Sequence, residues 1–451
     1  MNILGIIAEF NPLHTGHEYL IRRLRRETGA EFCVVAMSGD YVQRGEPAFF
    51  AKSLRTKAAL LSGADLVLEL PLSVSTGSAE YFAAGAVSLL DRLGCVTHLG
   101  FGSENGCAHD FELAGKLLAE EPEDYRELLR KNLKSGMSFP KARYEALSAC
   151  LAVSGTGISG DISAVLPLLK TPNNILGTEY CKALHRLHSS IVPVTVNRLG
   201  AGYHEEIDSA QKNTSCQNNS GAESSLCIKN ASVAESLPQT ANYASASGLR
   251  QAFLHSPSSE DAEILLQNYV PESCHSLYRN ALRQKQFVTF DDFFLPLYYT
   301  IQYSDAETLS LCQDVTPAFS GKLLRHFGHC SCITELCSAL KTKNLTSARI
   351  NRSLLHILLH LTKDATEAEK EQGYTLYARI LGFREEARPL LSRIKQQTSI
   401  PLVSKPADAP RYLSPLALSQ LERTAKASEL YRAVLPGAIY GSEYSQNIIV
   451  L

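Results

Sequence analysis

Short β-rich runs alternate with amphipathic helical stretches through the N-terminal third of the chain. Each apolar run leads, after a short connection, into a segment whose apolar residues recur with helical spacing. This rhythm is typical of a parallel sheet that carries helices on both faces and joins its strands by right-handed crossovers. The predicted strands are 2–8, 31–37, 65–70 and 96–101, and the predicted helices are 14–27, 49–62 and 78–93.

A helical insertion interrupts this alternation. Residues 107–154 combine helical periodicity with interspersed charges, and helix 175–188 and strand 191–198 then resume the earlier pattern. Residues 208–242 are rich in Ser, Asn, Gln and Ala. They predict a flexible loop, because they hold few large apolar side chains to offset the entropy of ordering.

The second half of the chain has a different character. Beyond about residue 260, Leu-rich faces at helical spacing replace the β-rich runs, and 451 residues exceed one ordinary core. We therefore predict the α/β class, with a Rossmann-like parallel-sheet domain over 1–260 that contains the helical insertion and the loop. A mostly α-helical C-terminal domain is predicted over 261–451.

Charge and cysteine content restrict the compartment and the partners. The 44 basic and 46 acidic residues give a formal net charge of −2, so a polyanion needs a local basic patch rather than a global field. The 12 cysteines are scattered over a chain without a secretory leader, which favours reduced thiols over a disulfide scaffold. No apolar run is long enough to cross a bilayer. We expect a soluble cytoplasmic protein without membrane contact, and no protein partner can be inferred from the sequence.

The sharpest chemical signal lies between Gly5 and His17, which read GIIAEFNPLHTGH. A predicted strand runs into a turn that opens a helix, so free backbone N–H groups and the positive end of the helix dipole favour an anion there. His14 and His17 can converge on one phosphate, and Gly16 lets a nucleotide approach the backbone. The segment therefore predicts adenylyl transfer from ATP, catalysed by positioned donors. The alternative is that both histidines are surface or capping residues.

Three segments together resemble one family. They are FNPLHTGH at 10–17, MSGDYVQRGEP at 37–47 and KTPNNILG at 170–177. The first is similar to the HxGH or HIGH signature of a nucleotidyltransferase superfamily, and the set resembles the bacterial tRNA(Met) cytidine acetate ligase family over most of the chain outside 208–242. The resemblance implies a ligase that activates acetate with ATP as acetyl-adenylate. It then acetylates N4 of the wobble cytidine (C34) of elongator tRNA(Met), releasing AMP and pyrophosphate.

The resemblance also implies an ATP site, with Mg²⁺ as the accompanying ion. The site is expected to span the first strand, the turn and the start of the helix, and to be completed from three other segments. Between Asn173 and Asn174 the former is preferred, because it follows the proline directly. The expected ATP-binding residues are Ile7, Ala8, Glu9, Phe10, Asn11, Pro12, Leu13, His14, Thr15, Gly16, His17, Glu18, Tyr19, Leu20, Gly102, Asn173, Asn174 and Arg198.

Physical chemistry is consistent with two of the distant positions. Gly102 follows a predicted central strand, at the edge where open α/β sheets bind ligands, and a side chain there would collide with an adenine or ribose. Arg198 ends another predicted strand, and its planar guanidinium suits a phosphate or a stacked base. The alternative for Arg198 is an ordinary surface arginine.

Asp40 is a third catalytic candidate, after the two histidines. It follows the second strand and is a candidate to position magnesium, a lysine or the acceptor, while Arg44 is a candidate partner for the acetate carboxylate or a phosphate. A plain turn with an Asx hydrogen bond is the alternative. Residues 245–250 resemble the Ser/Thr-rich segment with a following Arg that closes the nucleotide site in many adenylyltransferases. Gly248 departs from that pattern, which usually has a branched apolar residue.

Basic residues in the helical half predict an RNA-binding surface, which the resemblance supports, with a solvated basic face as the alternative. They are Lys322, Arg325, Lys341, Lys343, Arg349 and Arg352, opposed over that span only by Glu335, and Arg22, Arg23, Arg25 and Arg26 are candidates to extend them. No protein-bound metal is predicted, because the nearby cysteines and histidines lack the paired spacing of zinc ligands and are interpreted as packing residues. These are His326, His329, Cys330, Cys332 and Cys337.

Two other functions stay open at this point. One is a small-molecule adenylyltransferase of the pantetheine-phosphate adenylyltransferase type, which predicts a dispensable helical half and a second anion pocket. The other is a non-catalytic RNA-binding protein with a relic nucleotide fold, whose binding of tRNA would survive the loss of His14.

Overall fold

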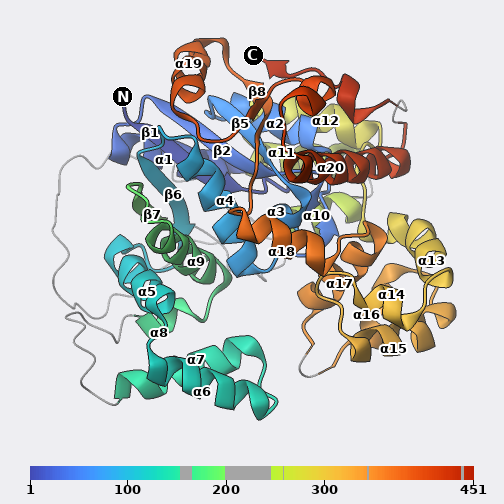
Figure 1. Ribbon diagram of the computed structural model, residues 1–451. Coiled ribbons are helices and arrows are strands. Elements are labelled where there is room, and N and C mark those ends of the chain that lie inside the picture. The colour runs from blue at the N-terminus through green and yellow to red at the C-terminus, as the bar shows by residue number, and fades with distance from the viewer. Residues whose placement is uncertain (153–164, 199–244, 257–258, 343–344, 438–440) are drawn as a thin grey trace, which may run out of the picture.

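A twisted sheet lies at the centre of the computed structural model (Figure 1). The structure describes residues 1–152, 165–198, 245–256, 259–342, 345–437 and 441–451. Within these residues the sheet has eight strands in the order β10-β8-β5-β2-β1-β6-β7, with β9 paired to β8. The predicted α/β class with a Rossmann-like parallel sheet is confirmed, and the predicted loop at 208–242 lies outside the described residues.

Five strands from the N-terminal half are mutually parallel and begin and end close to the predicted residues. They are β1 (Ile3–Ala8), β2 (Phe32–Ser38), β5 (Leu66–Leu70), β6 (His98–Ser103) and β7 (Val192–Asn197). The helices between them are α1 (Thr15–Thr28), α2 (Lys52–Leu61), α3 (Leu72–Ser75), α4 (Ala79–Arg92) and α9 (Pro172–Arg186). Because β1 pairs with both β2 and β6, the strand that leads into the histidine turn is central in the sheet.

Side chains of the central strands alternate between two cores, because helices cover both faces of the sheet. On β1, Ile3 lies in the core formed with α4 and α9, and Leu4 lies in the core formed with α1 and α2. On β2, Val34 and Val35 divide in the same way. Burial on both faces explains why these strands appear in the sequence as continuous apolar runs.

The predicted insertion at 107–154 is helical in its described residues. It contains α5 (Ala108–Glu120), α6 (Glu123–Lys134) and α7 (Phe139–Ala152), and the short helix α8 (Val165–Leu168) follows later in the chain. Gly115 of α5 packs so closely on α9 that a Cβ there would lie 2.6 Å from the carbonyl carbon of Cys181. In Figure 1, α5 lies beside α9, and α6 and α7 lie at the lower end of the molecule.

The prediction for the second half of the chain missed three strands. β8 (Ala378–Phe383) pairs antiparallel with β5, while β9 (Leu402–Val403) and β10 (Ile449–Val450) pair parallel with β8. The six residues of β8 are apolar except for Arg379, and a segment this short cannot be distinguished from part of a helix by periodicity. The other two strands have two residues each, too few for any pattern. The C-terminal half is nevertheless mostly helical, as predicted.

The core is continuous through the boundary expected near residue 260. On either side of it lie α10 (Ala246–His255), α11 (Ser259–Tyr269) and α12 (His275–Arg283), and all three contribute to the core beneath α1 and α2. A separate core is enclosed by α13 (Phe294–Gln302), α14 (Ala306–Ser310), α15 (Pro317–His326), α16 (Ile333–Leu340) and α17 (Ser347–Leu358). The chain then forms α18 (Lys363–Glu371), α19 (Arg388–Gln397) and α20 (Pro415–Val434). Among the described residues, no helix has both the length and the apolar character to cross a membrane.

Candidate active site

The turn between β1 and α1 folds both histidines back onto the helix start. His14 is the N-cap residue, and its Nδ1 accepts the backbone N–H of Gly16 at 3.1 Å. His17 Nδ1 accepts the backbone N–H of His14 at 3.2 Å, which completes a reciprocal cap. The two ring centroids lie 3.9 Å apart, and Phe10 packs edge-on against His17 at 5.1 Å. The rings therefore cap the helix through Nδ1, as the alternative interpretation proposed, while Nε2 stays available for chemistry.

Both imidazoles are neutral in the free protein. Burial, and then the charge of Arg198, lower the pKa of His14 from its ordinary 6.5 to about 3. Burial, His14 and Arg198 together lower the pKa of His17 well below 6.5. Since each Nδ1 accepts a hydrogen bond, the proton of each neutral ring is on Nε2. The turn thus offers two neutral N–H donors next to a cation.

These tautomers lead to a spectroscopic prediction. In ¹H–¹⁵N spectra of the imidazoles, His14 and His17 are expected to remain Nε2–H neutral tautomers from about pH 8 to about pH 5, whereas an ordinary histidine is protonated near pH 6.5. The signals are assigned by comparison with single His14→Ala and His17→Ala proteins. An inflection near pH 6.5 for either ring would contradict the burial argument.

Three contacts from distant segments hold the turn in place. The hydroxyl of Tyr278 accepts the backbone N–H of Leu13 at 3.1 Å. The side-chain oxygen of Asn11 accepts the backbone N–H of Phe49 at 2.7 Å, and Nη1 of Arg250 donates to the Asn11 carbonyl at 2.7 Å. Ser245 caps α10, with its Oγ accepting the N–H of Gly248 at 3.1 Å. The 245–250 segment therefore reaches the turn through its arginine.

The opposite wall of the site comes from β6, β7 and α9. Gly102 faces Arg198 and Leu20, because a Cβ there would lie 3.3 Å from Arg198 Cγ and 3.7 Å from Leu20 Cδ1. Nη1 of Arg198 donates to the side-chain oxygen of Asn173 at 3.1 Å. Since the charge of Arg198 also acts on both histidine rings, the structure brings together Gly102, Asn173 and the turn around this one guanidinium.

The structure separates the two asparagines that the sequence left undecided. Asn174 is buried, and its side-chain oxygen accepts the backbone N–H of Glu104 at 2.9 Å. Asn173 is half-buried and donates to the Glu104 carboxylate at 2.6 Å while contacting Arg198. This geometry favours Asn173 as the one that reaches a ligand. Hydrogen bonds of Glu104 connect the end of β6 to the start of α9. Glu104 was not predicted as a site residue, and its place two residues after Gly102 is the one signal for it.

Comparison with known proteins assigns the chain to a family. A model of the HIGH Nucleotidyl Transferase family matches residues 1–219 and 224–447. A curated Acetivibrio thermocellus protein named tRNA(Met) cytidine acetate ligase is 34% identical over 454 residues, covering 100% of both chains. A Clostridium perfringens protein of the same name is 35% identical over 450 residues, again covering 100% of both chains. This chain belongs to the tRNA(Met) cytidine acetate ligase family.

A solved structure extends the similarity to three dimensions. The crystal structure of Thermotoga maritima TmcAL bound with alpha-thio ATP matches this fold with a TM-score of 0.85 and 26% sequence identity, covering 100% of both chains. A second crystal structure of the same protein, in its apo form, gives the same TM-score and identity. The architecture of this member of the tRNA(Met) cytidine acetate ligase family is thus the one seen with a bound ATP analogue.

Asp40, the third catalytic candidate, is buried at the start of α2. Its side chain is 4% exposed, and Oδ1 accepts the backbone N–H of Lys52 at 2.7 Å, which caps the start of α2. Oδ2 lies 3.8 Å from Nζ of Lys52. These contacts correspond to a fixed turn, and a catalytic part for Asp40 stays a prediction.

The other predicted residues of the turn lie between the end of β1 and the first turns of α1. Ile7 and Ala8 end β1, and the Glu9 carboxylate accepts the backbone N–H of Gln43 at 2.9 Å. Burial raises the pKa of Glu9, although Gln43 and Arg250 act to lower it. The remaining members are Pro12, Thr15, Gly16, Glu18, Tyr19 and Leu20, of which all but Pro12 lie in α1.

Several basic residues of the predicted RNA surface are already paired. The paired residues on α1 are Arg22 with Glu18, Arg23 with Glu27 and Arg25 with Asp65, and in the helical half Arg352 pairs with Asp314 while Lys322 donates to the Leu340 carbonyl. Arg325, Lys341 and Arg349 are exposed, and Lys343 lies outside the described residues. Arg22 and Arg23 stay 74% and 46% exposed in their pairs, so the RNA-binding surface stays a prediction.

Cysteine side chains of the helical half make local contacts. Cys337 donates to the side-chain oxygen of Asn351 at 3.1 Å, and Cys330 to the His326 carbonyl at 3.5 Å. In the part of the chain that the structure describes, no three His, Cys, Asp or Glu side chains are arranged to hold a metal ion.

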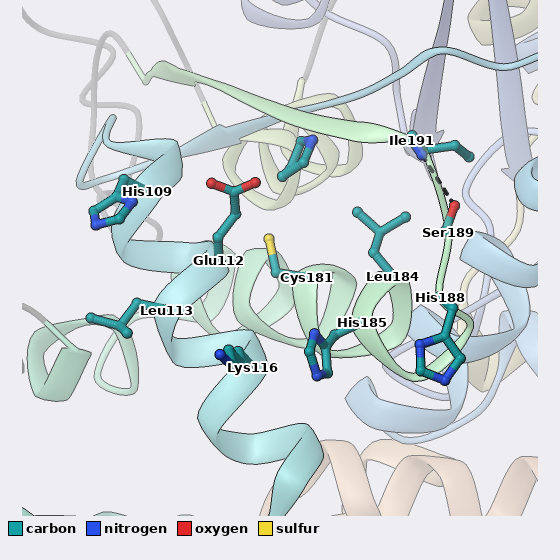
Figure 2. A pocket seen from close by; sticks show the side chains of 11 residues that line it. His109, Glu112, Leu113, Lys116, Cys181, Leu184, His185, His188, Ser189 and Ile191 are labelled. Atoms are coloured by element: carbon teal, nitrogen blue, oxygen red, sulfur yellow. Dashed lines mark hydrogen bonds between the residues drawn. The ribbon is translucent and has the colours of Figure 1, made fainter. Parts of the chain in front are cut away.

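A cavity of about 520 Å³ lies between α5, α9 and the start of β7 (Figure 2). Its lining includes Cys181 and Leu184 of α9 and His109, Glu112 and Lys116 of α5. None of the residues assigned to the histidine turn lines it. The cavity is therefore separate from the candidate active site.

Proposed function

We propose that this protein is an ATP-dependent ligase that activates acetate as acetyl-adenylate and then acetylates N4 of the wobble cytidine (C34) of elongator tRNA(Met). Its full-length relatives named tRNA(Met) cytidine acetate ligase support this reaction. The observation that carries the proposal is the pair of neutral imidazoles at the start of α1, held beside Arg198. AMP and pyrophosphate are the other products.

The first step needs stabilisation of charge on the reacting phosphate. An acetate oxygen attacks the α-phosphorus, the bond to the bridging oxygen breaks, and pyrophosphate leaves. The Nε2–H groups of His14 and His17 and the guanidinium of Arg198 supply donors for this charge, along with the N-terminus of α1. No covalent bond to the enzyme is required, because positioning accounts for most of the rate.

The second step transfers the acetyl group. The exocyclic N4 amine attacks the acetyl carbonyl, loses a proton, and AMP leaves with the electron pair of the broken C–O bond. The cytidine base must be unstacked to reach the anhydride, as is usual for bases read in RNA loops. We propose that residues 261–451 bind the tRNA, with exposed Arg325, Lys341 and Arg349 contacting phosphates. We place this activity in the cytoplasm.

The residues of the turn suit the triphosphate of ATP. The Oγ1 of Thr15 is buried without a hydrogen-bond partner in the described chain, at the helix start where a phosphate oxygen would lie. The carboxylates of Glu9 and Asp40 each already accept a backbone N–H. We propose that Mg²⁺ enters with the triphosphate of ATP, which is its usual mode with nucleotides.

The direct test uses the purified protein with ATP and labelled acetate. Elongator tRNA(Met) is present or omitted, and the nucleosides are then analysed for N4-acetylcytidine. We expect labelled N4-acetylcytidine only when tRNA is present, together with AMP and pyrophosphate in equal amounts. A folded protein that makes no N4-acetylcytidine under these conditions would rule the proposal out.

A Gly102→Ala substitution should weaken ATP binding with little effect on folding. The new Cβ would lie 3.3 Å from Arg198 Cγ, close enough to displace the arginine but not the backbone. We expect the KM for ATP to rise ~10-fold, about 1.4 kcal/mol, with a small change in melting temperature. Gly321→Ala is the matched control, because a Cβ there has no neighbour within 4 Å among the described residues. Equal KM values in the two variants would contradict the placement of Gly102.

A further inference from the structure

A small hairpin connects the ATP turn to the helical half. The junction hairpin is defined as residues 40–48 and contains β3 (Tyr41–Val42) and β4 (Glu46–Pro47). On one side, the backbone N–H of Gln43 binds the carboxylate of Glu9 at 2.9 Å. On the other, Gly45 has φ of +79° and presses on α17, where a Cβ would lie 2.2 Å from the backbone nitrogen of Arg352. The junction hairpin thus contacts both the ATP turn and helix α17 of the helical half.

The carboxylate of Glu46 contacts one side chain from the helical half and one from α10, next to the ATP turn. Oε1 accepts the side-chain N–H of Asn351 on α17 at 2.9 Å. Oε2 lies 4.0 Å from Nη2 of Arg250 on α10, with the side chains of Arg250 and Glu46 22% and 34% exposed. The same guanidinium donates through Nη1 to the carbonyl of Asn11, three residues before His14. Two hydrogen bonds and one 4.0 Å ion pair therefore link α17 to the turn.

We infer that Glu46 is a positioning residue that couples the helical half to the ATP turn. Its charge orients the Arg250 guanidinium, which then holds the Asn11 carbonyl, and its hydrogen bond to Asn351 makes that orientation depend on the position of α17. Binding of RNA to the helical half thereby changes the affinity of the turn for ATP, and ATP changes the affinity for RNA by the same factor. This coupling rests on the proposed function, since it takes the RNA to be elongator tRNA(Met).

Two substitutions test the contact of Glu46 with Arg250 and its contact with Asn351 separately. Glu46→Gln removes the charge that faces Arg250 but keeps an oxygen for Asn351. Asn351→Ala removes the link to α17 and leaves Glu46 beside Arg250. The affinity for ATP is measured by titration calorimetry without acetate, in the presence and absence of unmodified elongator tRNA(Met).

Glu46→Gln should weaken ATP binding about fivefold without RNA, which is the scale of one partly exposed ion pair. Asn351→Ala should bind ATP like the original protein without RNA, but should lose the change in affinity that tRNA causes. Glu263→Gln is the matched control, because Glu263 pairs with Arg279 at similar exposure, 30% and 33%, and neither residue takes part in the link between α17 and the turn. Its ATP affinity and its response to tRNA should not change.

The inference is overturned if Glu46→Gln binds ATP as tightly as Glu263→Gln, or if Asn351→Ala keeps the full response to tRNA. It is also overturned if tRNA leaves the ATP affinity of the original protein unchanged, even when acetylation proceeds. Intact coupling in a protein that forms no N4-acetylcytidine would count against the proposed reaction instead.

Discussion

A His17→Ala protein is expected to acetylate tRNA with a kcat about 10²- to 10³-fold lower than the original protein, the usual cost of one preorganised donor to a developing charge. The imidazole of His17 is neutral, carries its proton on Nε2 and lies in a partly desolvated site, so water cannot replace it at equal strength. His14→Ala should give a similar loss. The double variant should lose little more than either single variant, because the two rings act as one unit. Steady-state rates with ATP, acetate and elongator tRNA(Met) measure all three.

The capping role of His17 requires a control, since alanine also removes a hydrogen bond at the start of α1. Loss of a cap typically costs ~1 kcal/mol of stability. His17→Asn offers a side-chain oxygen for the His14 N–H but no Nε2–H at the position of the imidazole. We expect this variant to regain the lost stability and to remain as slow as His17→Ala. Recovery of activity in His17→Asn would show that the ring acts only as a cap.

Much of the nucleotide domain could be predicted because its signals are local. Buried parallel strands give continuous apolar runs, and helix spacing follows each run within a few residues. The site at the end of β1 was equally local, because strand, turn, histidines and helix start are adjacent in the chain. The approach of Gly102, Asn173 and Arg198 to that turn is not local, and it was expected only from the family resemblance. The hydrogen bond from Arg198 joins it to Asn173, and the charge of Arg198 acts on both histidine rings of the turn.

The features that sequence reasoning missed depend on long-range contacts. Tyr278 follows the turn by 265 residues, so nothing around Leu13 signals that its N–H needs a hydroxyl partner. β8 lies next to β5 because more than 300 residues of chain return to the sheet edge. Asp40 was a candidate to position magnesium, a lysine or the acceptor. The structure places it at the start of α2, 3.8 Å from the amine of Lys52, and a catalytic part for it stays a prediction.

The second large effect is expected at Glu443, in a buried cluster of charges near the C-terminus. The carboxylate is 1% exposed and contacts Lys52, with Arg379 Nη2 at 2.8 Å and Arg432 Nη1 at 3.0 Å. Glu443→Ala would leave Lys52 with Glu69 and Asp40 and Arg379 with Glu69, and it would remove the carboxylate that Arg432 contacts. Breaking such a buried pair typically costs about 3–5 kcal/mol, so we expect a loss of that size in urea unfolding at neutral pH. Glu385→Gln, at a surface pair with Arg388, should cost less than ~1 kcal/mol.

Acid unfolding tests whether Glu443 stabilises the fold through its charge or through its packing. Burial alone would raise the pKa of Glu443, but Lys52 and Arg379 outweigh it and lower that pKa from 4.5 to about 2. Because the folded value lies below the unfolded one, the contribution is present above about pH 4.5 and is lost as the pH falls toward about 2. The depressed pKa of His14 adds an earlier loss, which begins as unfolded imidazoles gain protons near pH 6.5. Glu443→Gln should therefore flatten the stability curve below pH 4.5 only, and an unchanged slope there would mean that Glu443 stabilises the fold by packing alone.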